Sequence, residues 1–170
     1  MTPSADRMEE FLAAVHRSRD LHTPWVSAPD TPAAFLGMLE RLRTPAHIGY
    51  WALTGRGALA GVVTFSEIVR GAFQSAYLGY YAFVPHHRQG HMTRSLGAAL
   101  SLAFGVHQLH RVEANIQPGN EASKALVRGL GFRLEGLSPR YLKIGGDWRD
   151  HERWALTAEE WELPPAGRPG

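Results

Sequence analysis

Residues 78–95 constrain the fold more than any other stretch of this 170-residue chain. Residues 78–84, LGYYAFV, are mostly apolar and rich in aromatic side chains, which is typical of a buried strand. Pro85 follows, and we expect the strand to end there because proline cannot donate a hydrogen bond to a sheet. The short loop 86–90 contains a glycine and leads into a helix-forming segment that begins near Thr93.

A strand that feeds a short loop and a helix points several backbone N–H groups at one spot. That spot has a partial positive charge and suits a phosphate or pyrophosphate group. Arg88 adds a cation at the rim. The stretch therefore predicts an anion site formed around residues 88–93.

Composition limits the other possibilities. A chain of this length fits one domain, and its 20% charged and 44% hydrophobic residues are ordinary for a globular protein. The sequence contains no cysteine, which excludes disulfides, thiolate metal sites and a cysteine nucleophile.

The formal net charge of +2 is too small to indicate direct nucleic-acid binding. We find neither a targeting signal at the N-terminus nor an apolar run long enough for a membrane. A cytoplasmic location is therefore expected. Residues 164–170 are rich in proline and glycine and are expected to form a disordered tail.

Hydrophobic spacing and turn residues predict a layered α/β (α+β) domain with a mixed sheet. The early helices come first, then two strands around a glycine turn, then a strand–helix–strand–helix series and a final hairpin. The expected helices are 8–19, 32–43, 93–105 and 121–130, and the expected strands are 47–54, 58–69, 78–84, 110–117, 132–144 and 148–156.

Two motifs carry a resemblance to the GNAT N-acetyltransferase superfamily. Its acetyl-CoA loop, Gln/Arg-x-x-Gly-x-Gly/Ala, falls here on His87, Gly90 and Met92, of which only the glycine fits the strict form. The second motif, RVEANIQPGNEASKALVRGLGF, is similar to the ribosomal-protein alanine N-acetyltransferase (Rim-type) branch. Its matching residues are Asn120, Ser123, Gly131 and Phe132.

The resemblance implies a GNAT fold over residues 1–163: a largely antiparallel sheet that splays at the cofactor site, flanked by helices, with a C-terminal β-hairpin. The strand that begins most family members has no obvious counterpart before the first helix. The resemblance also implies acetyl-CoA as acyl donor.

Residue by residue, the resemblance implies that the backbone of Phe83 and Val84 pairs with the pantetheine arm. Asn120 is expected to contact that arm. Ser123 is expected to lie near the sulfur, as proton donor to the leaving thiolate or as an orienting group, although it could instead cap its helix. The loop residues expected to hold the pyrophosphate are Arg88, Gln89, Gly90, His91, Met92 and Thr93.

A general base is harder to assign. Some GNAT branches have a glutamate where this chain has Asn115, and a tyrosine acid where it has Val127. Glu67 and Glu113 are the remaining carboxylate candidates, but strand glutamates are more often surface residues.

Other candidates have ordinary explanations. His86, His87 and His91 are closely spaced, but they lack carboxylate or cysteine partners at ligand spacing, so we expect a solvated loop and no metal. Asp150 could recognise a cationic amino terminus or be a surface charge of the hairpin. Aromatic residues that could line an acceptor cleft, or simply be core, are Trp25, Tyr50, Trp51, Phe73, Tyr141 and Trp148.

The resemblance implies direct acetyl transfer to a primary amine, by analogy a protein N-terminal α-amine of ribosomal type. A small-molecule amine such as an amino sugar, polyamine or antibiotic is the enzymatic alternative. A non-catalytic acyl-CoA sensor is the alternative of another class. A homodimer is possible, as in many relatives.

Overall fold

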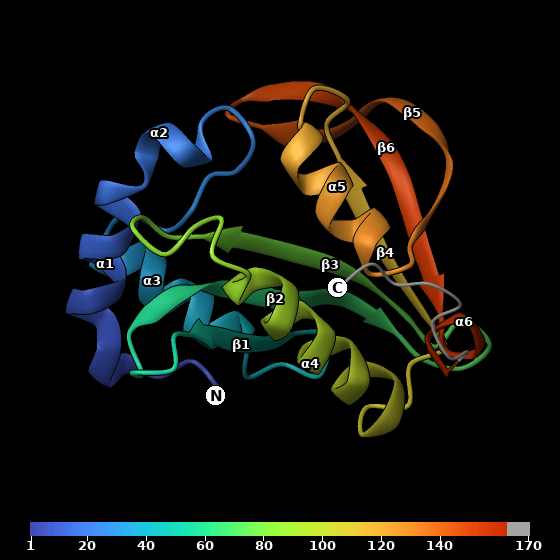
Figure 1. Cartoon of the computed structure of the whole chain (residues 1–170), viewed down its shortest axis with the longest axis horizontal. Coiled ribbons are helices and arrows are strands. Elements are labelled where there is room, and N and C mark those ends of the chain that lie inside the picture. Colours follow the sequence, from blue (N-terminus) through green and yellow to red (C-terminus); the bar gives the residue numbers. More distant parts are fainter. Residues whose placement is uncertain (163–170) are drawn as a thin grey trace.

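The computed structural model describes residues 1–162, in which helices flank a six-stranded sheet (Figure 1). The helical elements are η1 (Ala5–Arg7), α1 (Met8–Arg17), α2 (Arg19–His22), α3 (Pro32–Arg41), α4 (His91–Gly105), α5 (Glu121–Gly129) and α6 (Ala158–Glu162). The strands are β1 (Ile48–Leu53), β2 (Leu59–Val69), β3 (Ser75–Ala82), β4 (Arg111–Ile116), β5 (Arg133–Ile144) and β6 (Asp147–Thr157).

The strand order is β1-β2-β3-β4-β6-β5. Every neighbouring pair is antiparallel except β3 and β4, which are parallel. The crossover between these two strands carries α4, as a parallel connection requires. The mixed, largely antiparallel sheet and the C-terminal hairpin predicted from the sequence are confirmed.

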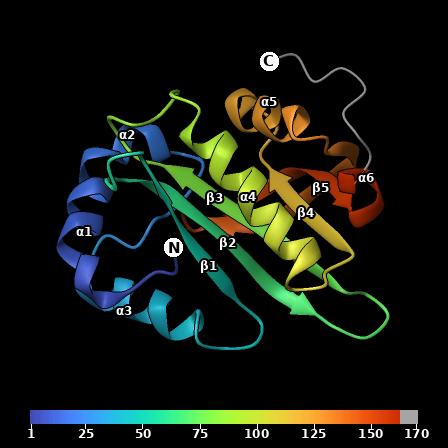
Figure 2. The ribbon, with the colours of Figure 1, turned by 60° about the horizontal axis from the view of Figure 1, so that its bottom comes forward.

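Different helices cover the two faces of the sheet (Figure 2). Apolar residues of α4 and α5 pack on one face, in a core cluster that includes Phe65, Leu100 and Val112. Residues of α1 and α3 pack on the other face, over β1 to β3. We call these the α5 face and the α1 face.

Aromatic rings fill the core of the α1 face. Phe11 and Phe35 have ring centroids 4.8 Å apart, and Phe11 also contacts Trp51 at 5.5 Å and Phe83 at 5.7 Å. The helix that carries Phe35 is capped at its N-terminus, because the Thr31 hydroxyl accepts a hydrogen bond from the Ala34 N–H.

Several predicted boundaries are wrong. The strand expected over 78–84 begins at Ser75 and ends at Ala82, since the Phe83 carbonyl accepts from the His86 N–H and the Val84 N–H donates to the Ser18 hydroxyl, outside the sheet. The helix expected over 8–19 breaks after Arg17, and the helix expected from Thr93 starts two residues earlier, at His91.

Other predictions concern the ends of the chain. No strand precedes β1 within residues 1–162, so the first strand of most family members has no counterpart there. Helix α6 was missed. The tail predicted at 164–170 lies outside the described residues. None of the helices in the described part is long and apolar enough to cross a membrane.

We expect Phe35→Ala to lower the free energy of unfolding by about 3–5 kcal/mol, because it empties a fully buried aromatic site. Urea denaturation measures this change. Leu36→Ala, on the next residue of α3, removes a side chain that is 47% exposed and should cost much less. Equal losses in the two variants would contradict the assigned orientation of α3.

Candidate active site

The central strands separate. β3 and β4 pair only at Ser75–Arg111, Ala76–Val112 and Tyr77–Glu113. Beyond these pairs, β3 continues to Ala82 while β4 stays paired with β6 up to Ile116. The sheet therefore contains a wedge-shaped gap, the splay that the family resemblance implied.

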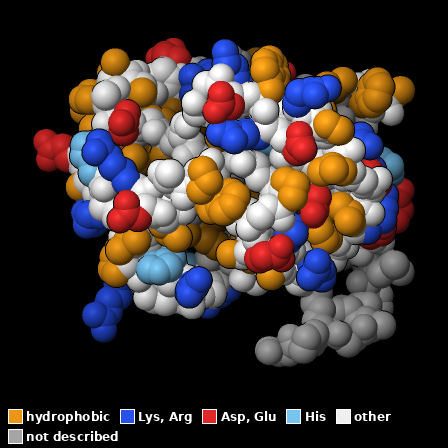
Figure 3. Space-filling model, turned by 90° about the horizontal axis from the view of Figure 1, so that it is seen from above, with side chains coloured by type: hydrophobic (Ala, Val, Ile, Leu, Met, Phe, Trp, Pro, Cys, Tyr) orange, Lys and Arg blue, Asp and Glu red, His pale blue; other side chains and the backbone are white. Residues whose placement is uncertain are grey.

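A cavity of about 420 Å³ lies at this gap. Its lining comes from β3, β4, the loop before α4, the first turns of α4 and α5, the segment after α2, and His151 of β6. Seen from above, the surface has a hollow near its middle with hydrophobic side chains on the floor (Figure 3).

The loop before α4 has the geometry of an anion site. Gly90 has a φ of +76° and precedes the first turn of the helix, whose N–H groups at His91, Met92 and Thr93 have no partners within the helix. The Arg88 side chain also lines the cavity. Because the helix dipole places partial positive charge here, this end of the cavity suits phosphate.

Of the predicted cofactor-binding residues, six line the cavity and four do not. The six are Arg88, Gly90, Met92, Thr93, Asn120 and Ser123. Gln89 donates its side-chain N–H to the Pro85 carbonyl at 2.8 Å, and His91 accepts from Arg94 at 2.8 Å, so both side chains have local partners.

Ser123 does not cap its helix. Asn120 does, by accepting a hydrogen bond from the Ser123 N–H at 3.1 Å. The Ser123 hydroxyl oxygen instead lies 2.5 Å from the hydroxyl oxygen of Tyr80, on β3. Burial raises the pKa of Tyr80 to about 12, so its hydroxyl keeps its proton at neutral pH. Sequence reasoning missed Tyr80.

The prediction for Phe83 and Val84 needs correction, because neither residue lines the cavity. The Phe83 N–H donates to the Ala60 carbonyl at 2.8 Å, and the His86 N–H donates to the Phe83 carbonyl at 2.9 Å. The Val84 N–H donates to the Ser18 hydroxyl at 3.0 Å. These backbone groups already have partners within the chain.

The backbone that faces the gap belongs to alternate residues of β3. Phe83 points its N–H at β2, so Ala82 and Tyr80 point theirs to the other side. The Ala82 carbonyl accepts from Nε2 of His22 at 2.8 Å, and burial lowers the pKa of that histidine. Tyr80 therefore replaces Phe83 and Val84 as the residue whose backbone can pair across the gap.

Polar groups from the α1 face reach the same cavity. Asn115 of β4 and Gln117, which directly follows β4, line it together with Trp25 and His151. Two buried polar atoms of lining residues, Oδ1 of Asn115 and Nδ1 of His87, have no hydrogen-bond partner in the described part of the chain. Such atoms are costly to leave unpaired, which indicates a ligand with polar groups.

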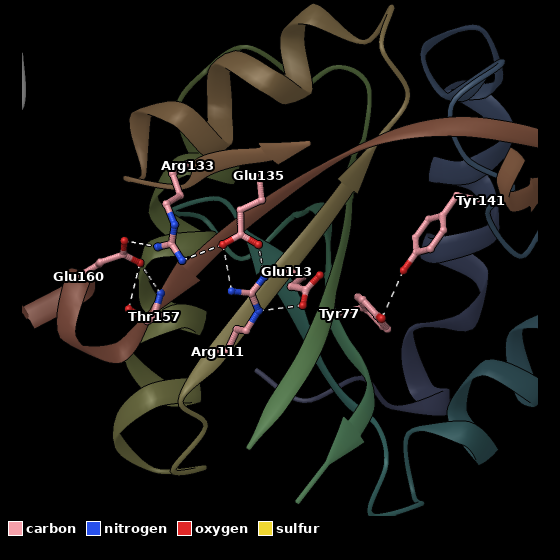
Figure 4. Close-up of polar contacts among 8 residues, drawn as sticks. All are labelled: Tyr77, Arg111, Glu113, Arg133, Glu135, Tyr141, Thr157 and Glu160. Atoms are coloured by element: carbon pink, nitrogen blue, oxygen red, sulfur yellow. Dashed lines mark hydrogen bonds and ion pairs between the residues drawn. The ribbon is translucent and has the colours of Figure 1, made fainter. Parts of the chain in front are cut away.

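The candidate carboxylates lie elsewhere. Glu67 is exposed, and Glu113 accepts a hydrogen bond from Nε of Arg111 at 2.8 Å. Arg111 also binds Glu135, which holds the pKa of that carboxyl below its usual value. Figure 4 shows Arg111, Glu113 and Glu135 in a network that reaches Arg133. The network lies at the closed end of the gap, where β3 and β4 are still paired.

Most of the other candidate residues lie outside the cavity or bind neighbouring residues of the chain. His86 and His91 have ring centroids 6.1 Å apart, and no group of three potential ligand residues for a metal occurs in the described part of the chain. Asp150 accepts a hydrogen bond from the Arg140 N–H at 2.7 Å, within the hairpin. Of the six aromatic residues considered for an acceptor cleft, only Trp25 lines the cavity.

We expect Ser18→Ala to lower the free energy of unfolding by about 1–3 kcal/mol, because it leaves the Val84 N–H without an acceptor. Ser18 is fully buried and also donates to the Ala14 carbonyl, four residues earlier. Ser101→Ala is the matched control, since Ser101 makes the same kind of bond to Gly97 on an exposed helix surface. Denaturation curves that shift equally would contradict the role of Ser18.

Comparison with known proteins agrees with this arrangement. The family model described as an acetyltransferase (GNAT) domain matches residues 2–133. The chain belongs to the GNAT acetyltransferase family. Membership makes it an N-acetyltransferase, and the family uses acetyl-CoA.

The relatives of this chain include Rim-type enzymes. The chain is 33% identical over 164 residues to the [ribosomal protein uS5]-alanine N-acetyltransferase of Escherichia coli (strain K12), covering 91% of this chain and 83% of that protein. The solved structure of Mycobacterium smegmatis RimJ in complex with CoA-disulfide is 29% identical, with a TM-score of 0.85 over 96% of this chain and 82% of that one.

A ribosomal-protein-S5-alanine acetyltransferase from Vibrio fischeri has the same fold, with a TM-score of 0.82 at 24% identity over 95% of this chain and 93% of that one.

Proposed function

We propose that this enzyme transfers an acetyl group from acetyl-CoA directly to a protein N-terminal α-amine, of the ribosomal-protein type. The observation that carries the proposal is the gap between β3 and β4, which has an anion site at the loop before α4 and the Tyr80–Ser123 hydroxyl pair beside α5.

The lining fits coenzyme A. Arg88 and the N–H groups at the start of α4 suit its phosphates. Its pantetheine arm contains amides, for which the backbone of Tyr80 and the unpaired Oδ1 of Asn115 offer complementary groups. When bound, the coenzyme supplies the acetyl group as a thioester.

Ser123 and Tyr80 can provide a proton to a leaving sulfur. The Ser123 hydroxyl lies on the α5 side of the gap, and the Tyr80 hydroxyl, which stays protonated, can replace a proton that Ser123 gives away. The presence of this proton-donating pair in the cavity favours an enzyme over an acyl-CoA sensor.

The choice of acceptor rests on two observations. The relative at 33% identity is named as an alanine N-acetyltransferase of a ribosomal protein. Among the described residues that line the cavity there is no aspartate or glutamate, whereas a polyamine with several positive charges would require such groups. An acceptor with a single ammonium group is therefore favoured.

We expect thiol release from acetyl-CoA with peptides that begin with a free alanine, and little with spermidine or amino sugars. In Ser123→Ala, kcat should fall about a hundredfold or more, because general acid catalysis is lost, while the Kd of CoA from calorimetry stays the same. Ser101→Ala should behave as wild type. Undiminished turnover in Ser123→Ala would remove its catalytic role, and absence of CoA binding in the wild type would overturn the proposed function.

We expect Gly90→Ala to weaken CoA binding about tenfold, because only glycine adopts a φ of +76° without strain. The added Cβ would also lie 3.2 Å from a guanidinium nitrogen of Arg94. Gly97→Ala is the matched control within α4, where the nearest atom lies 4.0 Å away. Calorimetry with CoA distinguishes the two, and equal affinities would contradict the role of the loop.

A further inference from the structure

Transfer to an ammonium group requires something to take its proton, and the family's glutamate position is Asn115 in this chain. No carboxylate replaces it in the cavity lining that residues 1–162 form. Glu113 is paired with Arg111, and Glu152 is held by Lys124 at 3.4 Å and by the indole N–H of Trp154 at 3.1 Å. Tyr81 also lines the cavity, but burial raises the pKa of its hydroxyl, so it keeps its proton.

The lining contains two histidines, and imidazole is the side chain that most readily exchanges a proton near neutral pH. His87 belongs to the loop that also presents Arg88 and Gly90, at the anion end of the cavity. His151 comes from β6, on the far side of β4 from that loop.

The ring of His151 has a defined orientation. It is only 3% exposed, and Nδ1 lies 2.9 Å from the Arg149 carbonyl. A carbonyl oxygen can only accept, so Nδ1 carries the hydrogen and the neutral ring has its lone pair on Nε2. Nε2 makes no hydrogen bond to another residue of the described chain, so it is available to a molecule in the cavity.

The strand places His151 opposite the proton donor. Glu152 contacts Lys124 of α5, and the ring of Trp154 lies under Arg128 of α5, so these residues of β6 point to the α5 face. Side chains alternate along a strand, and His151 therefore points to the α1 face. Ser123 approaches the gap from α5, on the opposite side.

We propose that His151 is the catalytic residue that takes the proton from the acceptor ammonium, a role that rests on the function proposed above. The ammonium has two protons to lose. The first passes to Nε2 of His151 and then to solvent, which frees the nitrogen lone pair to form the C–N bond. The second makes up for the proton that Ser123 gives to the departing sulfur as the C–S bond breaks. The products are therefore the amide, the thiol and one released proton.

The test compares thiol release by the wild type and four variants, with an alanine-terminated peptide as acceptor. In His151→Asn the side-chain amide can still donate to the Arg149 carbonyl but cannot take a proton. We expect kcat/KM to fall about a hundredfold, with unchanged thermal melting and CoA affinity. His110→Asn is the matched control, since His110 is exposed and pairs with Glu159 at the surface.

The third variant, His151→Gly, separates proton transfer from packing. Imidazole and 1,2,4-triazole have nearly the same size but differ strongly in basicity. If His151 is the base, added imidazole restores turnover much better than triazole does. Equal rescue by both compounds would show that the ring only fills space.

Two further outcomes also overturn the proposal. They are wild-type activity in His151→Asn, and imidazole rescue of His87→Gly in place of His151→Gly. If the wild type binds CoA but acetylates no amine, the proposed function itself fails, and the role of His151 fails with it.

Discussion

The separation of β3 from β4 after their third residue pair is the constraint on which the site depends. Strands that stay in a sheet satisfy one another's backbone groups, and strands that separate leave those groups in need of partners. The chain supplies one partner itself, because His22 donates to the Ala82 carbonyl. The groups of Tyr80 remain facing the gap, beside the N-terminal ends of α4 and α5.

The closed end of the gap is held by charge. Arg111 stands at the first β3–β4 pair and shares Glu135 with Arg133, which in turn binds Glu160 of α6 (Figure 4). A single exposed ion pair would contribute little, but these side chains are partly buried and share partners. The network ties β4, β5 and α6 together, so the two strands separate from a fixed point.

Much of this arrangement could be predicted from local sequence. Two features are each encoded by residues that are close together in the sequence. They are the glycine loop before α4 and the Asn120–Ser123 pair at the start of α5. Helix α6 could have been predicted too, since Thr157 and Glu160 form a capping box, S/T-x-x-E, in which the Thr157 N–H donates to Glu160 at 2.8 Å.

The rest depends on contacts between distant segments. The backbone N–H groups of Phe83 and Val84 bind Ala60 and Ser18, and neither residue lines the cavity. The Tyr80 hydroxyl contacts Ser123 of α5, a helix that begins some forty residues later. His151 directly follows Asp150 in the sequence. Only the pairing of β6 with β4 shows which of the two side chains reaches the gap.

A gap through a sheet has two sides, and here both sides contribute to the lining. Ala122, Ser123 and Leu126 of α5 line one side, and Trp25 and Val26 line the other. Two molecules that arrive from opposite faces do not obstruct each other's path. Both substrates can therefore be bound at once, and initial rates with both concentrations varied should give intersecting double-reciprocal lines, the pattern of a ternary complex.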